Sequence, residues 1–279
     1  MAARMIGRHI RGRFLGAGIV VALSAFLIFQ YETSWADNPH IVYVTGWGLF
    51  TLMLYLTLFN VRKKLAFMPL VNTRTWLQVH IYLGLLTAII FLLHAQWHWP
   101  SGRLESVLAA LFVAVTASGI VGWGVSRAIP SRMTAVGGEV PFEEIPAARL
   151  ALRKKAEVLV VQVIPTAKAS TLAEFYAGRL TEFFAGPANF QAHLFGSRRP
   201  LNRLLGQMAE VSRFLSEDEK RGLEQLTVLV RQKDALDFHR ASQIVLKGWL
   251  FLHIPLTYGL LVFSVAHIVV VYAFSGGRR

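Results

Sequence analysis

The chain has 279 residues, a formal net charge of +13 and no cysteine. Hydrophobic residues make up 54% of it and charged residues only 16%, whereas about a quarter of the residues in soluble globular domains are charged. The absence of cysteine excludes disulfides, thiolate-held iron–sulfur clusters, covalently attached c-type haem and thiolate zinc sites. Any metal centre must therefore use other side chains, and the nine histidines are the first candidates.

Five stretches of the chain contain no Asp, Glu, Lys or Arg. They cover residues 14–31, 38–61, 75–102, 106–126 and 248–277. About 20 mostly apolar residues are needed to cross the roughly 30 Å of a bilayer core. We therefore predict an all-α integral membrane protein with about five transmembrane helices. Their expected bounds are 14–31, 41–60, 76–96, 105–126 and 245–275, the first four forming a membrane domain over residues 1–126.

Most charged residues lie between the fourth and fifth predicted spans. Residues 127–247 hold 18 of the 29 Lys and Arg and 13 of the 16 Asp and Glu. Hydrophobic periodicity predicts helices over residues 145–164, 171–184, 200–215 and 216–243, the last running directly into span five. Ser216 and Glu219 have the spacing of a capping box. We expect residues 127–244 to form a small cytoplasmic helical domain, either a docking surface or a structural insertion.

Basic residues are divided unevenly between the two sides of the predicted bundle. Residues 1–13 carry four Arg and residues 62–74 carry four more Lys and Arg, whereas the loops on the other side carry only Arg103. Because loops rich in Lys and Arg stay in the cytoplasm, we expect a cytoplasmic N-terminus and a periplasmic C-terminus, in a bacterial inner membrane. Topology and contact with anionic membrane lipid explain the positive charge, so nucleic acid is not an expected partner.

Four histidines lie inside apolar spans. His80 and His94 belong to span three, His253 and His267 belong to span five, and each pair is separated by 14 residues. Fourteen residues are nearly four helical turns, so both histidines of a pair share one helix face, about 21 Å apart. Spans three and five run in the same direction, which puts His80 level with His253 and His94 level with His267.

Two imidazoles at the same depth on neighbouring helices are typical axial ligands of a haem iron. Ionisable side chains inside a membrane are unfavourable and usually functional. We therefore predict two b-type haems: an inner one with iron ligands His80 and His253, and an outer one with iron ligands His94 and His267. A di-metal or proton-relay cluster would need these ligands close together, and the separation of about 21 Å argues against it.

Four further residues are candidates for the haem or quinone sites, each with a plainer alternative. His98 lies one turn beyond His94 and could replace it as ligand, contact a propionate or quinol headgroup, or be an interfacial histidine. Arg103 could pair with an outer propionate or simply set the topology. Gly84 and Gly259 could let a porphyrin approach the backbone or serve ordinary helix packing.

The residues around these histidines resemble those of a known group of proteins. The stretch from Trp76 to Gly84, continuing to His94, is similar to the third-span signature of di-haem membrane cytochromes b. Ser118-Gly119-Ile-Val-Gly122, and His253 to Gly259 with His267, resemble the same di-haem cytochrome b and ferric-reductase-like transmembrane superfamily. The resemblance covers residues 42–127 and 244–275 and implies two stacked haems b held by paired histidines.

Ferric reductases and NADPH oxidases of this superfamily carry a flavin- and nicotinamide-binding domain after their spans. Here only residues 275–279 follow span five, and the polar insertion is not part of their pattern. We therefore expect an electron-transfer subunit of a respiratory oxidoreductase complex. It would exchange electrons with quinone, preferably near the outer loop 96–103, and with partners such as multihaem cytochromes c or iron–sulfur proteins.

Two other functions stay open from the sequence. One is a freestanding transmembrane oxidoreductase that acts on a small acceptor such as superoxide or a metal ion. The other is a haem-free membrane scaffold or transporter whose histidines line a path, which predicts a colourless protein.

Overall fold

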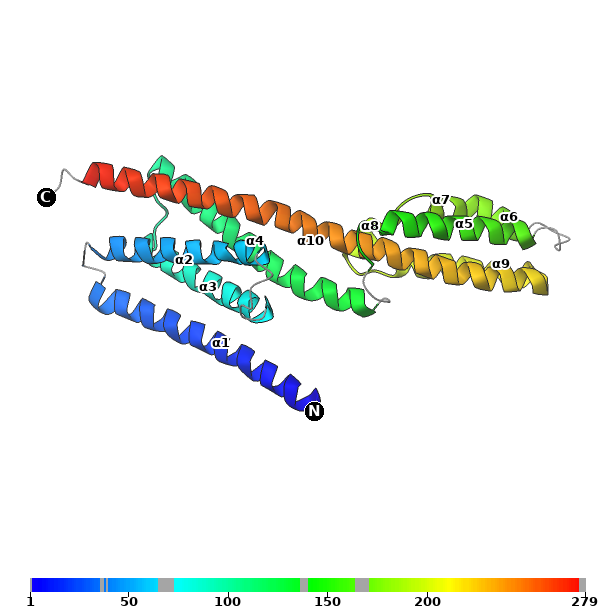
Figure 1. Ribbon diagram of the computed structural model, residues 1–279, viewed down its shortest axis with the longest axis horizontal. Helices are drawn as coiled ribbons and strands as arrows, with labels where there is room; N and C mark the ends of the chain where they lie inside the picture. The colour runs from blue at the N-terminus through cyan, green and yellow to red at the C-terminus, as the bar shows by residue number, and fades with distance from the viewer. Residues whose placement is uncertain are drawn as a thin grey trace. The chain divides into compact units, whose positions relative to one another are not determined.

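The computed structural model describes residues 2–35, 38, 40–64, 73–135, 140–163 and 171–275. All regular structure in these ranges is helical, and no strand occurs in them (Figure 1). The chain divides into two compact units. We call residues 1–123 with 249–279 the apolar unit, and residues 124–248 the polar unit.

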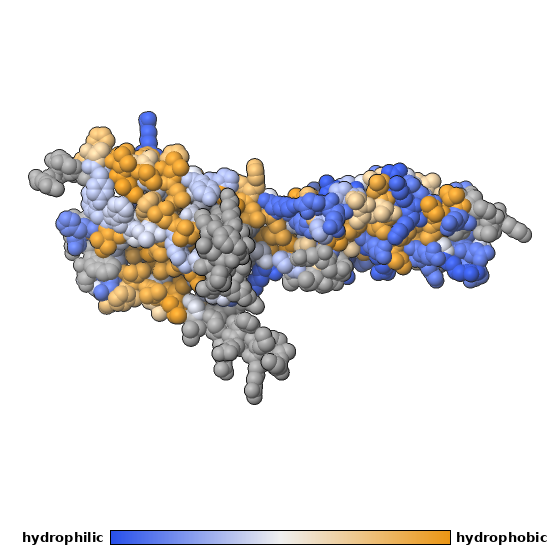
Figure 2. Space-filling view, in the orientation of Figure 1, coloured by the Kyte–Doolittle hydropathy of each residue, from blue (hydrophilic) through white to orange (hydrophobic). Residues whose placement is uncertain are grey.

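Five helices of the described chain are long and apolar enough to cross a membrane, as the sequence predicted. They are α1 (Ala2–Gln30), α2 (Ile41–Lys64), α3 (Thr73–His94), α4 (Arg103–Ala135) and α10 (Glu217–Ser275), and a π-helical turn, η1 (Tyr31–Trp35), continues α1. Large apolar side chains project outward from them; Phe251 and Phe274 of α10 are 83% and 82% exposed. Figure 2 shows this hydrophobic surface over the apolar unit. Such a surface is what hydrocarbon, rather than water, would cover.

Three helices extend well beyond their predicted apolar blocks. α1 begins at Ala2, twelve residues before the predicted start of span one at residue 14. α4 runs to Ala135, nine residues beyond the predicted end of span four, and contains Pro130. α10 has 59 residues and includes both the predicted helix 216–243 and span five, as expected. Charged residues limit how much of a helix can enter hydrocarbon, but they do not end the helix itself, so hydropathy underestimated α4.

The core of the apolar unit is made by four helices. Leu49 and Met53 of α2, Phe112 of α4 and Leu260 of α10 form a buried cluster. Phe91 of α3 stacks on Phe112 with ring centroids 4.3 Å apart. These contacts bring α3 and α10, the helices with the predicted histidine pairs, into one bundle.

The polar unit has its own hydrophobic core. Along the described part of the chain, seven elements lie between the end of α4 and the start of α10. They are α5 (Ile145–Val163), α6 (Thr171–Phe175), a π-helical turn η3 (Tyr176–Leu180), α7 (Thr181–Ala185), α8 (Phe190–Leu194), α9 (Arg199–Val211) and a 3₁₀ turn η4 (Ser212–Phe214). The predicted capping box is confirmed, because the Ser216 amide donates to Glu219 Oε2 at 3.0 Å and the Glu219 amide donates to Ser216 Oγ at 3.4 Å.

A buried ion pair stabilises the interior of the polar unit. The Lys233 ammonium is fully buried and donates to Asp237 Oδ2, which also accepts from the Ala188 amide at 2.9 Å. Burial lowers the pKa of Lys233, and the hydrogen bond from Lys233 to Asp237 opposes that shift. Burial also raises the pKa of the neighbouring Asp234.

Candidate functional site

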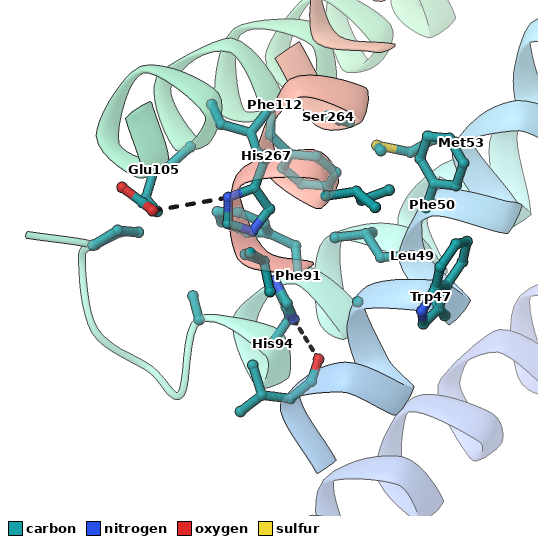
Figure 3. Close-up of a pocket in the computed structure, with 18 of the residues that line it drawn as sticks. Trp47, Leu49, Phe50, Met53, Phe91, His94, Glu105, Phe112, Ser264 and His267 are labelled. Carbon is teal, nitrogen blue, oxygen red and sulfur yellow. Dashed lines mark hydrogen bonds and ion pairs between the residues drawn. The ribbon is translucent and has the colours of Figure 1, made fainter. Parts of the chain in front are cut away.

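A cavity of about 520 Å³ lies among α2, α3, α4 and α10, entirely within the apolar unit (Figure 3). Its walls include the buried cluster of Leu49, Met53, Phe112 and Leu260. His94 from α3 and His267 from α10 both line it, and Figure 3 shows the two imidazoles directed into the same space. Ligand and cofactor pockets commonly measure about 300–1,000 Å³, so the cavity is large enough for such a group.

The His94 ring is oriented by α2. Its Nδ1 lies 3.0 Å from the Val42 carbonyl oxygen and 3.3 Å from Thr45 Oγ1. The Thr45 hydroxyl donates to the Ile41 carbonyl at 2.8 Å, so its oxygen faces His94 as an acceptor. Because both neighbours of Nδ1 accept hydrogen bonds, Nδ1 carries the proton. Nε2 then keeps a lone pair, which is the tautomer a metal-binding histidine needs.

Gly46 makes room for this ring. A Cβ built on Gly46 would lie only 2.9 Å from His94 Cε1, closer than ordinary contact. By contrast, a Cβ on Gly48, half a turn further along α2, would meet nothing within 4 Å. The small residue at position 46 is therefore tied to the position of the His94 imidazole.

His267 has a carboxylate as its neighbour. Its Nδ1 lies 3.9 Å from Glu105 Oε1, an ion-pair distance that exceeds a hydrogen bond. Glu105 belongs to the first turn of α4 and also lines the cavity. Carboxylates on the non-ligating nitrogen are common partners of metal-bound histidines. Both cavity histidines thus have an oxygen on the Nδ1 side.

An aromatic wall closes another side of the cavity. The Trp47 indole on α2 donates to the Tyr272 hydroxyl on α10 at 2.9 Å. Tyr43 meets the Tyr272 ring edge-on, with centroids 6.4 Å apart. All three residues line the cavity. This hydrogen bond gives the polar N–H of the indole a partner within the apolar helix α2.

The loop after α3 turns sharply at the cavity. The Trp97 amide donates to the Leu92 carbonyl and the Gln96 amide to the Leu93 carbonyl, as in a Schellman cap. Gln96 and Trp97 have positive φ values of 52° and 60°. The loop leaves His98 exposed, with Nδ1 against the Gln96 carbonyl, and His98 also lines the cavity.

The inner histidines have separate neighbours and do not line this cavity. His253 Nδ1 lies 3.2 Å from Ser118 Oγ on α4, and its ring stacks on Trp249 with centroids 5.6 Å apart. The Trp249 indole donates to the Ser118 carbonyl at 2.8 Å. A Cβ on Gly122 would overlap that indole, so glycine is required for this contact between α4 and α10.

His80 faces a different helix. Its ring lies against Phe59 of α2, with centroids 5.1 Å apart. One turn earlier on α3, Trp76 stacks on Tyr55 of α2 at 5.8 Å. The contacts of His80 therefore differ from those of His253, although the sequence puts both at one depth.

The remaining candidate residues are Arg103, Gly84 and Gly259. Arg103 begins α4, is exposed and does not line the cavity. A Cβ at Gly84 or at Gly259 would meet nothing within 4 Å. Helix packing therefore does not require glycine at either position, and open space lies beside both.

Among the described residues, no three His, Asp or Glu side chains cluster as they would around a metal ion. A haem iron needs only two protein ligands, because the porphyrin supplies the other four. His94 and His267 are two such side chains on the wall of one cavity.

Sequence reasoning missed Glu105, Gly46 and the bond between Trp47 and Tyr272. Glu105 carried only a compositional signal, as one of three acidic residues outside 127–247, and this signal does not indicate that its carboxylate faces His267. The partners of Gly46 and Trp47 depend on helix rotation, for which a single sequence gives no signal.

Comparisons with known protein families, with curated proteins and with solved structures found no match to this chain.

Proposed function

We propose that this chain is a di-haem b membrane cytochrome subunit that carries electrons across a bilayer, between quinone and partner redox proteins. One observation carries the proposal: His94 and His267, on two different apolar helices, line a single cavity of about 520 Å³. A bound haem would supply the one-electron redox chemistry, for which these side chains alone are not suited.

The outer pair fits a haem by its own chemistry. The Nδ1 proton of His94 is directed to the Val42 carbonyl, which leaves Nε2 free as a ligand. Glu105, on the Nδ1 side of His267, would likewise favour a proton on Nδ1 of His267 and leave its Nε2 free as a ligand. The surrounding Leu49, Phe91 and Phe112 provide the apolar walls that suit a porphyrin face.

The inner pair supports the proposal in a different way. His80 and His253 contact Phe59 and Ser118 respectively, so the assignment of an inner haem rests on their matched spacing of 14 residues. Open space beside Gly84 and Gly259 is compatible with a plate-like group between α3 and α10.

We assign the quinone-binding face to the outer loop. His98, Trp99 and Ser101 line the cavity next to His94. Aromatic and polar side chains together suit a quinone ring, which presents two carbonyl oxygens and an apolar plane. The His98 ring is exposed, so it can reach a headgroup that arrives from the membrane surface.

The test is the reduced-minus-oxidised visible spectrum of the purified chain, with haem quantified by pyridine haemochrome. We expect two low-spin b haems per chain, one haem in His267→Ala, and two in the matched control His98→Ala. Retention of both haems in His267→Ala would show that His267 is not a ligand of the outer haem. A colourless protein from haem-sufficient cells would reject the cytochrome and leave a membrane scaffold or transporter.

A further inference from the structure

A second cavity lies wholly within the polar unit, and three arginines line it. Its volume is about 410 Å³, and it is bordered by the first half of α5, the end of α7 and α10. The arginines are Arg149 and Arg153 of α5 and Arg240 of α10. No Asp or Glu is among its described lining residues, so the wall carries positive charge only.

Carboxylates outside the wall neutralise this charge incompletely. Arg153 Nε donates to Glu157 at 2.8 Å. Arg149 Nε lies 3.8 Å from Asp237 Oδ1, but Asp237 is already the partner of the buried Lys233. The Arg240 side chain makes no hydrogen bond or ion pair with any residue in the part of the chain that is described. Two guanidinium groups therefore face the cavity without a full counter-charge.

Like charges around a partly buried space repel each other unless an anion joins them. Arg149 and Arg153 are four residues apart on one helix, a spacing at which like charges destabilise the helix. The first turn of α5, at Ile145 and Pro146, also borders the cavity and contributes the positive end of its dipole. These features favour an anion with more than one negative charge.

We propose that this cavity binds the phosphate group of an organic phosphate. Guanidinium groups match phosphate oxygens in pairs, and a dianion balances the excess charge of Arg149 and Arg240 better than a carboxylate does. Phe142, Leu150 and Phe184 form an apolar border that suits the organic part of such a molecule. The phosphate source is either a phospholipid headgroup or a soluble nucleotide, and both present the same group.

The experiment is calorimetric titration of the full-length chain in a neutral detergent. The probes are dioctanoyl phosphatidic acid and adenosine monophosphate, with dioctanoyl phosphatidylcholine as the lipid control. Arg240→Gln should weaken phosphate binding at least about tenfold, since hydrogen bonds to charged groups are the stronger ones. The control Arg231→Gln removes an exposed arginine of α10 outside the cavity and should leave binding within about twofold.

The two probes distinguish the source of the phosphate. Binding of phosphatidic acid alone assigns a lipid headgroup, and binding of the nucleotide assigns a soluble ligand. Arg153→Gln serves as a second variant and should also weaken binding. Binding of neither probe, or wild-type binding by both cavity variants, would overturn the proposal. This result would not alter the haem count, so the two proposals can fail independently.

Discussion

The outer and inner histidine pairs of the apolar unit have the same spacing but different surroundings. His94 and His267 line one cavity; the His94 Nδ1 lies 3.0 Å from the Val42 carbonyl of α2, and the His267 Nδ1 lies 3.9 Å from Glu105 Oε1 of α4. His80 instead lies against Phe59 of α2, and His253 is fixed by Ser118 and stacks on Trp249. Equal spacing along two helices therefore does not produce equal sites.

The difference shows what sets the position of an imidazole in a helical bundle. A spacing of 14 residues determines which helix face and which depth each ring occupies. The neighbouring helix then decides whether the ring turns to its counterpart or to another side chain. At the outer pair small and polar residues of α2 direct His94 toward the cavity, whereas at the inner pair α4 binds His253.

The largest effect should come from disrupting the inner contact between α4 and α10. In Gly122→Ala the new methyl group overlaps the Trp249 indole, and we expect a loss of about 3 kcal/mol of stability, the upper range for overpacking. The matched control is Gly124→Ala, where a Cβ meets nothing within 4 Å and helix propensity should raise stability slightly. Thermal unfolding of both proteins in detergent measures the difference, and equal midpoints would show that the contact does not form.

A smaller effect is expected at the outer pair from Gly46→Ala. The added methyl group would lie 2.9 Å from His94 Cε1, so the ring must shift by a few tenths of an ångström, at about 1–2 kcal/mol. Gly48→Ala is the control, since space there is open. If His94 is a haem ligand, the visible spectrum of Gly46→Ala should change while that of Gly48→Ala does not. An unchanged spectrum in both variants would show that His94 is not a haem ligand.

Ser118→Ala should have a smaller effect on stability and tests the inner pair. It removes the hydroxyl 3.2 Å from His253 Nδ1 but keeps the carbonyl that holds Trp249, and should lower stability by about 1 kcal/mol. In the di-haem proposal only the inner haem should be lost more easily in detergent. Preferential loss of the outer haem would mean that the two pairs are assigned in the wrong order.

The smallest effect is expected at the aromatic wall. Trp47→Phe removes the indole donor to Tyr272, and both side chains are about half exposed, so the change should be about 0.5 kcal/mol. Tyr272→Phe removes the acceptor, and the double variant should lose no more than either single variant. Additive losses would show that the two residues do not act as a pair.

Features governed by local chemistry were predictable from the sequence. The uncharged stretches predicted the five long apolar helices, and the spacing of Ser216 and Glu219 predicted where α10 begins. Helix continuity through Lys247 also followed, because nothing there breaks the periodicity. Each of these depends on residues within a few turns of one another.

Features set by helix rotation were not predictable. That α2 presents Gly46 and Val42 to His94, while Phe59 meets His80, depends on how α2 and α3 turn about their axes. Polar contacts fix such rotation only when partners from different helices are known. Glu105 was missed for the same reason, since nothing local indicates that its carboxylate faces His267.

The hydrogen-bonded Trp47 has an optical consequence. Its indole forms part of the cavity wall that includes both outer histidines, and its surroundings are fixed by the bond to Tyr272. A porphyrin absorbs where tryptophan emits, so excitation energy would pass from Trp47 to a group bound in the cavity. The fluorescence difference between the wild type and Trp47→Phe would then report what fraction of the protein has a porphyrin in the cavity lined by His94 and His267.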